Sequence, residues 1–169
     1  PAIEDGHHVS IDLPVRNVNR TVGTLLGHEV TKKWKGAGLP DGTIDITLTG
    51  SAGQSLGAFL PAGIQIRLVG DANDYVGKGL SGGRIVIYPP KQSTFVPEEN
   101  VIIGNVVLYG GIAGQAFFRG RAVAKFNDQI TSLQWDALTF GENATARTFH
   151  FPHPAPATTP AHAVSACGC

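Results

Sequence analysis

The sequence predicts a mainly β protein, a β-solenoid whose coil repeats about every 20 residues. Three features of the 169-residue chain support this fold: 22 glycines, apolar columns that recur at this spacing, and glycine or proline at the end of each column pair. A helical repeat would need 3.6-residue periodicity and would not tolerate this much glycine. A β-sandwich is the alternative, but it gives no reason for one residue class to return to the same column four times.

The repeat is clearest from Thr43 onward. Two apolar columns stand two positions apart and are followed by a glycine or proline column, which describes a short strand ending in a turn. The aligned sets are Ile46, Ile66, Val86, Val106; Leu48, Leu68, Tyr88, Leu108; Gly50, Gly70, Pro90, Gly110; Leu56, Val76, Val96, Ala116; and Gly57, Gly77, Pro97, Phe117. Stacked coils would bury a continuous core, and the glycines would supply positive φ at the corners.

A strand and one α-helix are expected before the repeats. Residues 9–13 alternate apolar and polar side chains, which favours a short strand ended by Pro14. Asn19 is a good N-cap for a helix over residues 19–33 with cations in its last turn. The expected apolar face of that helix consists of Val22, Leu25, Leu26 and Val30.

Four regions are therefore expected along the chain. Residues 1–40 are the strand and helix lead-in, and residues 41–123 are the solenoid. The columns fade after that point, so residues 124–151 are a divergent segment for which no structure is predicted. Residues 152–169 form an irregular tail rich in proline and alanine, which we expect to be disordered because proline suits neither helix interiors nor central strands.

Composition narrows the classes of function. Lys+Arg and Asp+Glu both total 13, so the chain has no overall attraction to nucleic acid or to an anionic membrane. No stretch approaches the roughly 18 apolar residues of a transmembrane helix. Methionine is absent, which suggests a fragment of a longer chain. We expect a cytoplasmic location, because nothing indicates a secretory signal or a disulfide framework.

Several short motifs have simple structural interpretations. Residues 77–82 match G-x-G-x-x-G, but residues 83–88 read as a strand, whereas a dinucleotide site needs a helix there. A solenoid corner explains these glycines. Residues 71–74 cluster side-chain oxygens without calcium-loop spacing, and we expect them to bind turn backbone. His28 lacks the second histidine of H-E-x-x-H.

The sequence predicts no catalytic, cofactor-binding or metal-binding residue in this chain. There is no G-x-S-x-G motif, and no pair of carboxylates stands out as an acid and base couple. Histidines and cysteines gather on the proline-rich tail, where no preorganised geometry is expected and metal binding would be adventitious. These residues are His150, His153, His162, Cys167 and Cys169.

The glycine-rich stretches also carry a family resemblance over roughly residues 10–123. They are NRTVGTLLG at 19–27, GLP at 38–40, TGSAGQSLGAF at 49–59, VGDANDYVGKGLSGGR at 69–84, and residues 104–121. Together they resemble the C-terminal domain of the large (alpha) subunit of glutamate synthase. The resemblance implies a right-handed single-stranded β-helix built on G-x-x-G-x-x-x-G repeats, seen here as Gly50, Gly53 and Gly57.

The resemblance implies a non-catalytic structural domain of an oxidoreductase of ammonia assimilation, which makes glutamate from glutamine and 2-oxoglutarate. In that family the glutaminase nucleophile is an N-terminal cysteine of another domain. FMN and an iron–sulfur cluster sit in the central synthase domain, with NAD(P)H or ferredoxin as electron source. The implied partners are the glutaminase and synthase domains of the parent chain, and the small (beta) subunit as a further one. After about Val123 the sequence departs from the family, which continues with more glycine-rich coils.

Two other functions are weighed against this one. The first is a stand-alone β-helix subunit of another redox complex, such as formylmethanofuran dehydrogenase, one of whose subunits has a similar glycine-repeat domain. The helix at 19–33 and the linker to Pro40 favour glutamate synthase instead. The second is an independent β-helix enzyme. Hexapeptide acyltransferases have a six-residue period that is absent here, and polysaccharide enzymes need carboxylates stacked on one face.

Overall fold

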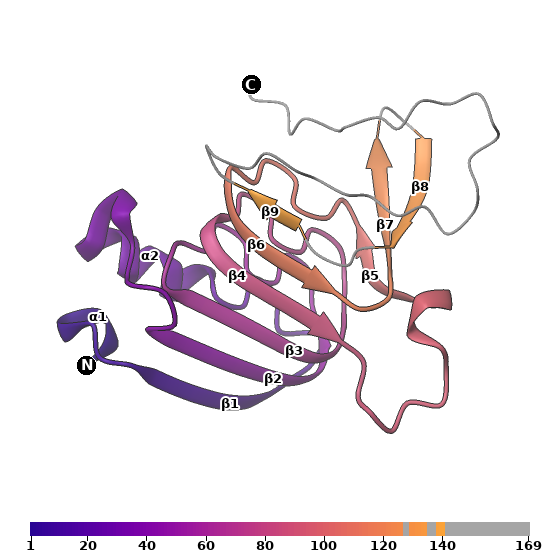
Figure 1. Ribbon diagram of the computed structural model, residues 1–169, viewed down its shortest axis with the longest axis horizontal. Helices are drawn as coiled ribbons and strands as arrows, with labels where there is room; N and C mark the ends of the chain where they lie inside the picture. The colour runs from indigo at the N-terminus through magenta and orange to yellow at the C-terminus, as the bar shows by residue number, and fades with distance from the viewer. Residues whose placement is uncertain (127–128, 135–137, 141–169) are drawn as a thin grey trace.

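The computed structural model describes residues 1–126, 129–134 and 138–140 of the chain. In the described part, five strands lie side by side and run parallel (Figure 1). They are β1 (Val9–Val15), β2 (Ile44–Ala52), β3 (Ile64–Ala72), β4 (Ser81–Tyr88) and β6 (Ala113–Phe118). The fold is therefore mainly β and built on a parallel sheet, as the sequence predicts.

Shorter strands extend this sheet. β5 pairs in parallel with β3, and β7 pairs in parallel with β5. β8 pairs antiparallel with β7, and β9 pairs antiparallel with β6.

No helix in the described part of the chain is long and apolar enough to cross a membrane. The remaining bounds are α1 (Ala2–Asp5), α2 (Thr24–Trp34), η1 (Lys35–Ala37), η2 (Pro97–Glu99), β5 (Val101–Asn105), β7 (Arg121–Phe126), β8 (Gln129–Gln134) and β9 (Leu138–Phe140).

The predicted repeat length is confirmed between β2 and β3. Ile46 lies opposite Ile66, and Leu48 lies opposite Leu68, so each pair is separated by one predicted period. All four side chains are buried in one apolar core. Side chains alternate between the faces of a strand, so both strands present every second residue to this core.

The next repeat is one residue shorter than predicted. Ile66 lies opposite Ile85 rather than Val86 in the pairing of β3 with β4. A shift of one residue turns every side chain of a strand to the other face. Ile85 is fully buried, while Val86 and Tyr88 are only half-buried on the outer face. The predicted column positions of Val86 and Tyr88 are therefore wrong.

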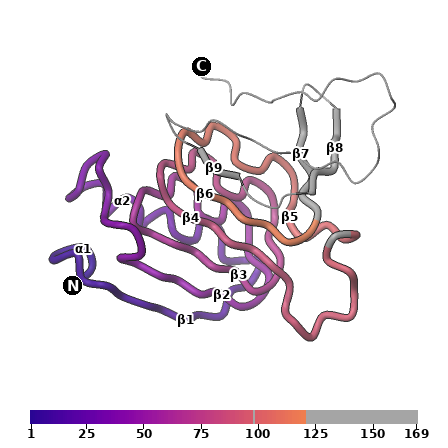
Figure 2. Tube along the Cα trace, in the orientation of Figure 1, coloured from indigo at the N-terminus to yellow at the C-terminus, as the bar shows by residue number. Residues whose placement is uncertain are grey.

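The following repeat is longer than predicted, because a segment is inserted after β4. β6 pairs with β4 so that Ala116, well beyond one period along the chain, lies opposite Ile85. The inserted segment projects away from the sheet between β4 and β5 (Figure 2). Val96 lies on it and is 50% exposed, so its predicted buried position is wrong. Val106 and Leu108 lie in a turn rather than in a strand, although Leu108 is buried as predicted.

The sheet begins earlier than residue 41. β1 pairs with β2 along its whole length, with Ile11 opposite Ile46 and Leu13 opposite Leu48. The strand also continues through Pro14 to Val15, whereas the sequence predicts that Pro14 ends it. Proline is tolerated here because β1 is an edge strand among the described residues, and an edge strand leaves one row of N–H groups unpaired.

Helix α2 starts at Thr24, later than the sequence predicts. Gly23, in the left-handed region, occupies the N-cap position, and Asn19 instead closes a preceding turn by accepting a hydrogen bond from the Arg16 amide (2.9 Å). Val30 faces the core as expected, but Leu25 is 76% exposed. The apolar face of the helix is therefore narrower than the periodicity suggests.

The two helices are joined at their ends. Trp34 donates its indole N–H to the carbonyl of Ile3 (2.8 Å), and Lys33 pairs with Glu4. The hydrogen bond and the positive charge of Lys33 hold the pKa of Glu4 below its ordinary value. The cations predicted in the last turn of α2 are present, and Lys33 holds the N-terminal segment in place by pairing with Glu4.

Substitution at Ile85 and Val86 tests the register of β4. Ile85→Ala should destabilise the fold by about 2–5 kcal/mol, because it leaves a cavity in the core. Val86→Ala should cost less than about 1 kcal/mol, since Val86 lies on the outer face. Urea denaturation of both variants measures the difference. A larger loss for Val86→Ala would contradict the pairing of Ile85 with Ile66.

Candidate functional site

Each repeat contains a turn in which left-handed residues stand at alternate positions. Consecutive turns are joined by backbone hydrogen bonds. The Gly77 amide donates to Leu56 O, and the Leu108 amide donates to Val76 O, both at 2.8 Å. The left-handed residues, with φ between 55° and 68°, are Ser55, Gly57 and Phe59; Tyr75, Gly77 and Gly79; and Val106, Leu108 and Gly110.

These turns explain the G-x-G-x-x-G motif of residues 77–82. The amides of Gly77 and Gly79 are already used, because they donate to Leu56 O and Tyr109 O at 2.8 Å. The motif leads into strand β4 rather than into a helix, as the sequence predicts. The phosphate site of a dinucleotide-binding motif needs free amides at a helix N-terminus. The predicted role of these glycines in a turn is confirmed.

The oxygen cluster at residues 71–74 also serves the backbone. Asp74 accepts a hydrogen bond from the Asn105 amide at its Oδ1 (2.7 Å), which links one turn to the next. Asn73 accepts one from the Asp74 amide at its own Oδ1 (2.7 Å). The interpretation of these side chains as turn-binding groups is confirmed for Asn73 and Asp74.

The remaining candidates for metal binding fall into two sets. His28 Nε2 and Glu29 Oε1 lie 3.9 Å apart, and both side chains are exposed on α2. Within the described part of the chain, no group of three or more His, Cys, Asp or Glu could hold a metal ion. The tail residues lie outside the described residues; they are His150, His153, His162, Cys167 and Cys169.

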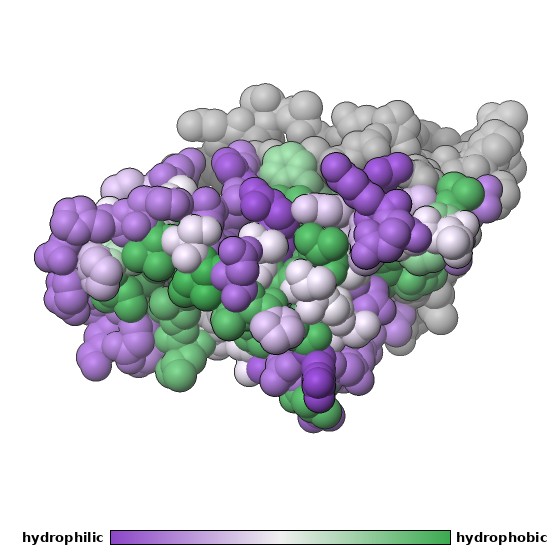
Figure 3. Space-filling model, turned by 90° about the horizontal axis from the view of Figure 1, so that it is seen from below, coloured by the Kyte–Doolittle hydropathy of each residue, from purple (hydrophilic) through white to green (hydrophobic). Residues whose placement is uncertain are grey.

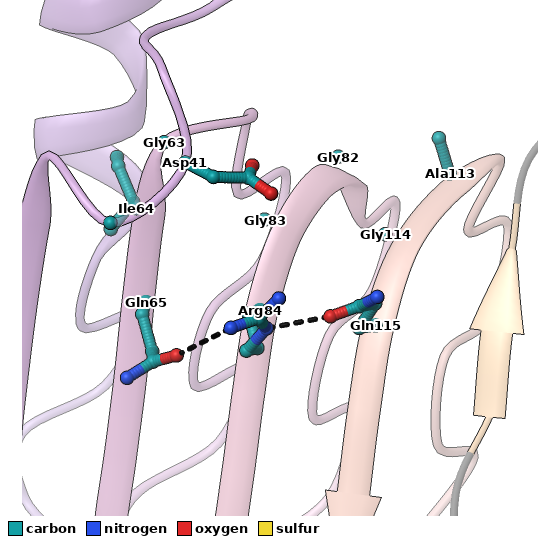
Figure 4. Close-up of a pocket in the computed structure, with 11 residues that line it drawn as sticks. Asp41, Gly63, Ile64, Gln65, Gly82, Gly83, Arg84, Ala113, Gly114 and Gln115 are labelled. Atoms are coloured by element: carbon teal, nitrogen blue, oxygen red, sulfur yellow. Dashed lines mark hydrogen bonds between the residues drawn. The ribbon is translucent and has the colours of Figure 1, made fainter.

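A hollow of about 290 Å³ lies over the starts of β3, β4 and β6 (Figure 4). Arg84 stands at its centre, between Gln65 on β3 and Gln115 on β6. The guanidinium donates from Nε to Gln115 Oε1 at 2.6 Å and from Nη1 to Gln65 Oε1 at 3.3 Å. Asp41, from the loop before β2, extends toward Gly83 over the same opening.

The sheet register explains this arrangement. Gln65 lies opposite Arg84, and Arg84 lies opposite Gln115, so three long polar side chains form one line across the outer face. Glycine is needed at the strand starts around the hollow, because a Cβ would clash with Leu39 at Gly63, with Leu60 at Gly83 and with the Gly83 carbonyl oxygen at Gly114. The glycines that line the hollow are Gly42, Gly63, Gly82, Gly83 and Gly114.

Sequence reasoning missed this hollow. Its three central residues are not separated by the predicted period, because one repeat is short and the next is long, so no predicted column contains them. The polar line also extends to Asp45 on β2, opposite Gln65. The Oδ1 atom of Asp45 is buried and has no hydrogen-bond partner among the described residues. The outer face at this end of the sheet therefore carries the positive charge of Arg84 and the negative charge of Asp45. No ion pair joins these two side chains in the described structure.

Comparison with known proteins identifies the family. The family model described as "GXGXG motif" matches residues 1–131. The chain belongs to this family. The parallel register and the glycine turns described above lie within the matched residues.

Several large enzymes contain a segment similar to this chain. Glutamate synthase [NADH] of Schizosaccharomyces pombe is 50% identical over 73% of the chain. The glutamate synthase [NADPH] large chain of Bacillus subtilis is 48% identical over 74%, and a ferredoxin-dependent glutamate synthase of Oryza sativa subsp. japonica is 47% identical over 74%. The chain spans only 6–8% of the length of these relatives. It carries a GXGXG domain of the glutamate synthase type.

Replacement of Asp74 separates a turn-binding role from a calcium-binding role. Asp74→Ala should destabilise the fold by about 1–3 kcal/mol, because the Asn105 amide loses its acceptor. The unfolding midpoint in urea should be the same with calcium or with a chelator. The control is Asp71→Ala, which alters an exposed carboxylate of the same cluster and should change stability by no more than about 0.5 kcal/mol. A midpoint raised by calcium would contradict this role.

Proposed function

We propose that this chain is a right-handed single-stranded β-helix that serves as a non-catalytic structural domain of a glutamate synthase large chain. It would hold the glutaminase and synthase parts of the parent enzyme in a defined relation. The similarity to glutamate synthases is the single observation that carries this proposal. The small (beta) subunit is a further candidate partner. We place the parent enzyme in the cytoplasm.

The β-helix interpretation is supported by pairing at two places in each repeat. Strands of consecutive repeats pair in parallel, and their turns are joined by backbone hydrogen bonds in the same order. The Gly57 amide donates to Val22 O, and the Gly77 amide donates to Leu56 O. A chain that pairs with the preceding repeat at both strand and turn advances as a coil. A right hand is expected, because parallel connections in one sheet are overwhelmingly right-handed.

The structural role is supported by the range of similar enzymes. Their names specify NADH, NADPH or ferredoxin, yet their identity to this chain is 50%, 48% and 47%. A segment whose similarity to this chain is about the same whichever electron donor the enzyme uses is not expected to handle that donor. We therefore assign FMN, the iron–sulfur cluster and the glutamine-hydrolysing cysteine to the rest of the parent chain.

A docking role is supported by the open end of the sheet at β1. Ile11 and Leu13 lie opposite core residues of β2, yet they are 37% and 51% exposed. Figure 3 views the molecule from this side, where hydrophobic residues lie among hydrophilic ones. A solenoid whose terminal strand exposes core side chains needs a further segment to cover them. We propose that the synthase part of the parent chain covers it.

The chain by itself should be inactive. Purified protein is expected to hydrolyse no glutamine and to form no glutamate from 2-oxoglutarate, with or without FMN and an electron donor. Assays of ammonia release and glutamate formation measure both reactions. Turnover by the isolated chain would overturn the structural role.

Substitution at the open end tests docking in the full-length parent enzyme. Burial of a leucine side chain stabilises an interface by about 1.5–3 kcal/mol, and a carboxylate in its place adds a desolvation cost. Leu13→Asp should therefore raise the ratio of glutamine hydrolysed to glutamate formed, and it should expose the domain boundary to limited proteolysis. Val18→Asp is the matched control, since Val18 is 79% exposed and belongs to no core column. Equal behaviour of the two variants would exclude β1 as the docking end.

A further inference from the structure

The hollow above Arg84 carries two opposite charges that do not neutralise each other. Asp41 lies at its opening and Arg84 at its centre. No ion pair joins them in the described structure, and the Asp41 carboxylate makes no hydrogen bond to any described residue. Two unlike charges that share a hollow without contact leave a gap that a ligand of complementary charges can bridge.

Arg84 is held in a fixed orientation. Its Nε and Nη1 atoms donate to amide oxygens on the two neighbouring strands, at 2.6 Å and 3.3 Å. Both acceptors are neutral, so the positive charge of the guanidinium is not cancelled. A guanidinium has five N–H donors, and those on Nη2 are not engaged by the described residues. An oriented, uncancelled guanidinium with free donors suits a carboxylate.

The carboxylate of Asp41 suits the opposite group. It stands on the other side of the opening and can accept hydrogen bonds from an ammonium group. The hollow of about 290 Å³ is small, and glycines form much of its wall. It has room for a compact charged group rather than for a large apolar one, and its open mouth leaves a ligand's side chain in water.

We propose that this hollow binds a free α-amino acid, with the carboxylate on Arg84 and the ammonium facing Asp41. Gln65 and Gln115 act as positioning residues, because they hold the guanidinium at this orientation. This site goes beyond the structural role proposed above and does not depend on it. The docking role can fail while the hollow still binds its ligand, and the reverse is also possible.

Titration of the full chain with glycine tests the proposal. Two-dimensional NMR of the ¹⁵N-labelled protein follows the amides of Gly83 and Gln115 and the Nε–H signal of Arg84. Glycine should shift these signals and saturate them, whereas acetate and methylammonium, which each carry one charge, should bind at least about tenfold more weakly. Absence of saturable shifts with glycine would overturn the proposal, as would equal affinity for acetate and glycine.

Variants locate the two contacts. Arg84→Gln should weaken glycine binding about tenfold or more, because a charge-assisted hydrogen bond is lost. Asp41→Asn should weaken it about two- to fivefold and should leave acetate binding unchanged or stronger. Dispersed spectra of each variant show that the fold is intact. Should Arg84→Gln unfold, Arg84→Lys retains the charge without the planar fork and should also weaken binding.

Two matched controls complete the test. Arg67→Gln removes an arginine from the same face of β3, outside the hollow, and Asp71→Asn removes an exposed carboxylate at the far end of that strand. Both should bind glycine as the unchanged protein does. Equal weakening by Arg84→Gln and Arg67→Gln would indicate a general charge effect and would overturn the site.

Discussion

Parallel backbone pairing between consecutive repeats is the constraint on which the rest of this structure depends. Strand bonds join β1 to β2, β2 to β3, β3 to β4 and β4 to β6, and turn bonds join the same repeats behind them. Neighbouring backbones then lie about 4.8 Å apart at every level. Gly70 shows that this close approach excludes a side chain, since a Cβ there would overlap the carbonyl oxygen of Gly50. Glycine is therefore required by contact between repeats as well as by positive φ.

The same pairing decides what each face of the sheet can do. Inward positions form unbroken apolar lines such as Ile46, Ile66 and Ile85, which leave little choice of side chain. Outward positions face solvent, and there the register brings Gln65, Arg84 and Gln115 into one line. A fold that depends on backbone bonds and an apolar core leaves its outer face available for recognition. The hollow above Arg84 is a consequence of that freedom.

The open edge at β1 follows from the same geometry. A repeat can satisfy its strand bonds only by lying next to another repeat, so the first strand has one unpaired side in the described structure. Pro14 and the exposed polar residues Ser10 and Asp12 reduce the risk that another chain pairs there. Ile11 and Leu13 nevertheless remain exposed, which suits a domain that is covered by the rest of a longer protein.

The sequence by itself determined the β class, the spacing between β2 and β3, and the strand that follows the G-x-G-x-x-G motif. These features depend on local residue patterns: apolar alternation, left-handed glycines and the absence of a helix signal after residue 82. The family resemblance was also readable from the sequence.

Only the tertiary structure decided that Ile85, not Val86, faces the core, because one residue fewer in a turn reverses the faces of the next strand. It also decided that the insertion after β4 delays the next strand, and that Arg84 meets a glutamine on each neighbouring strand. Such contacts depend on turn lengths summed along the chain, which no fixed period can supply.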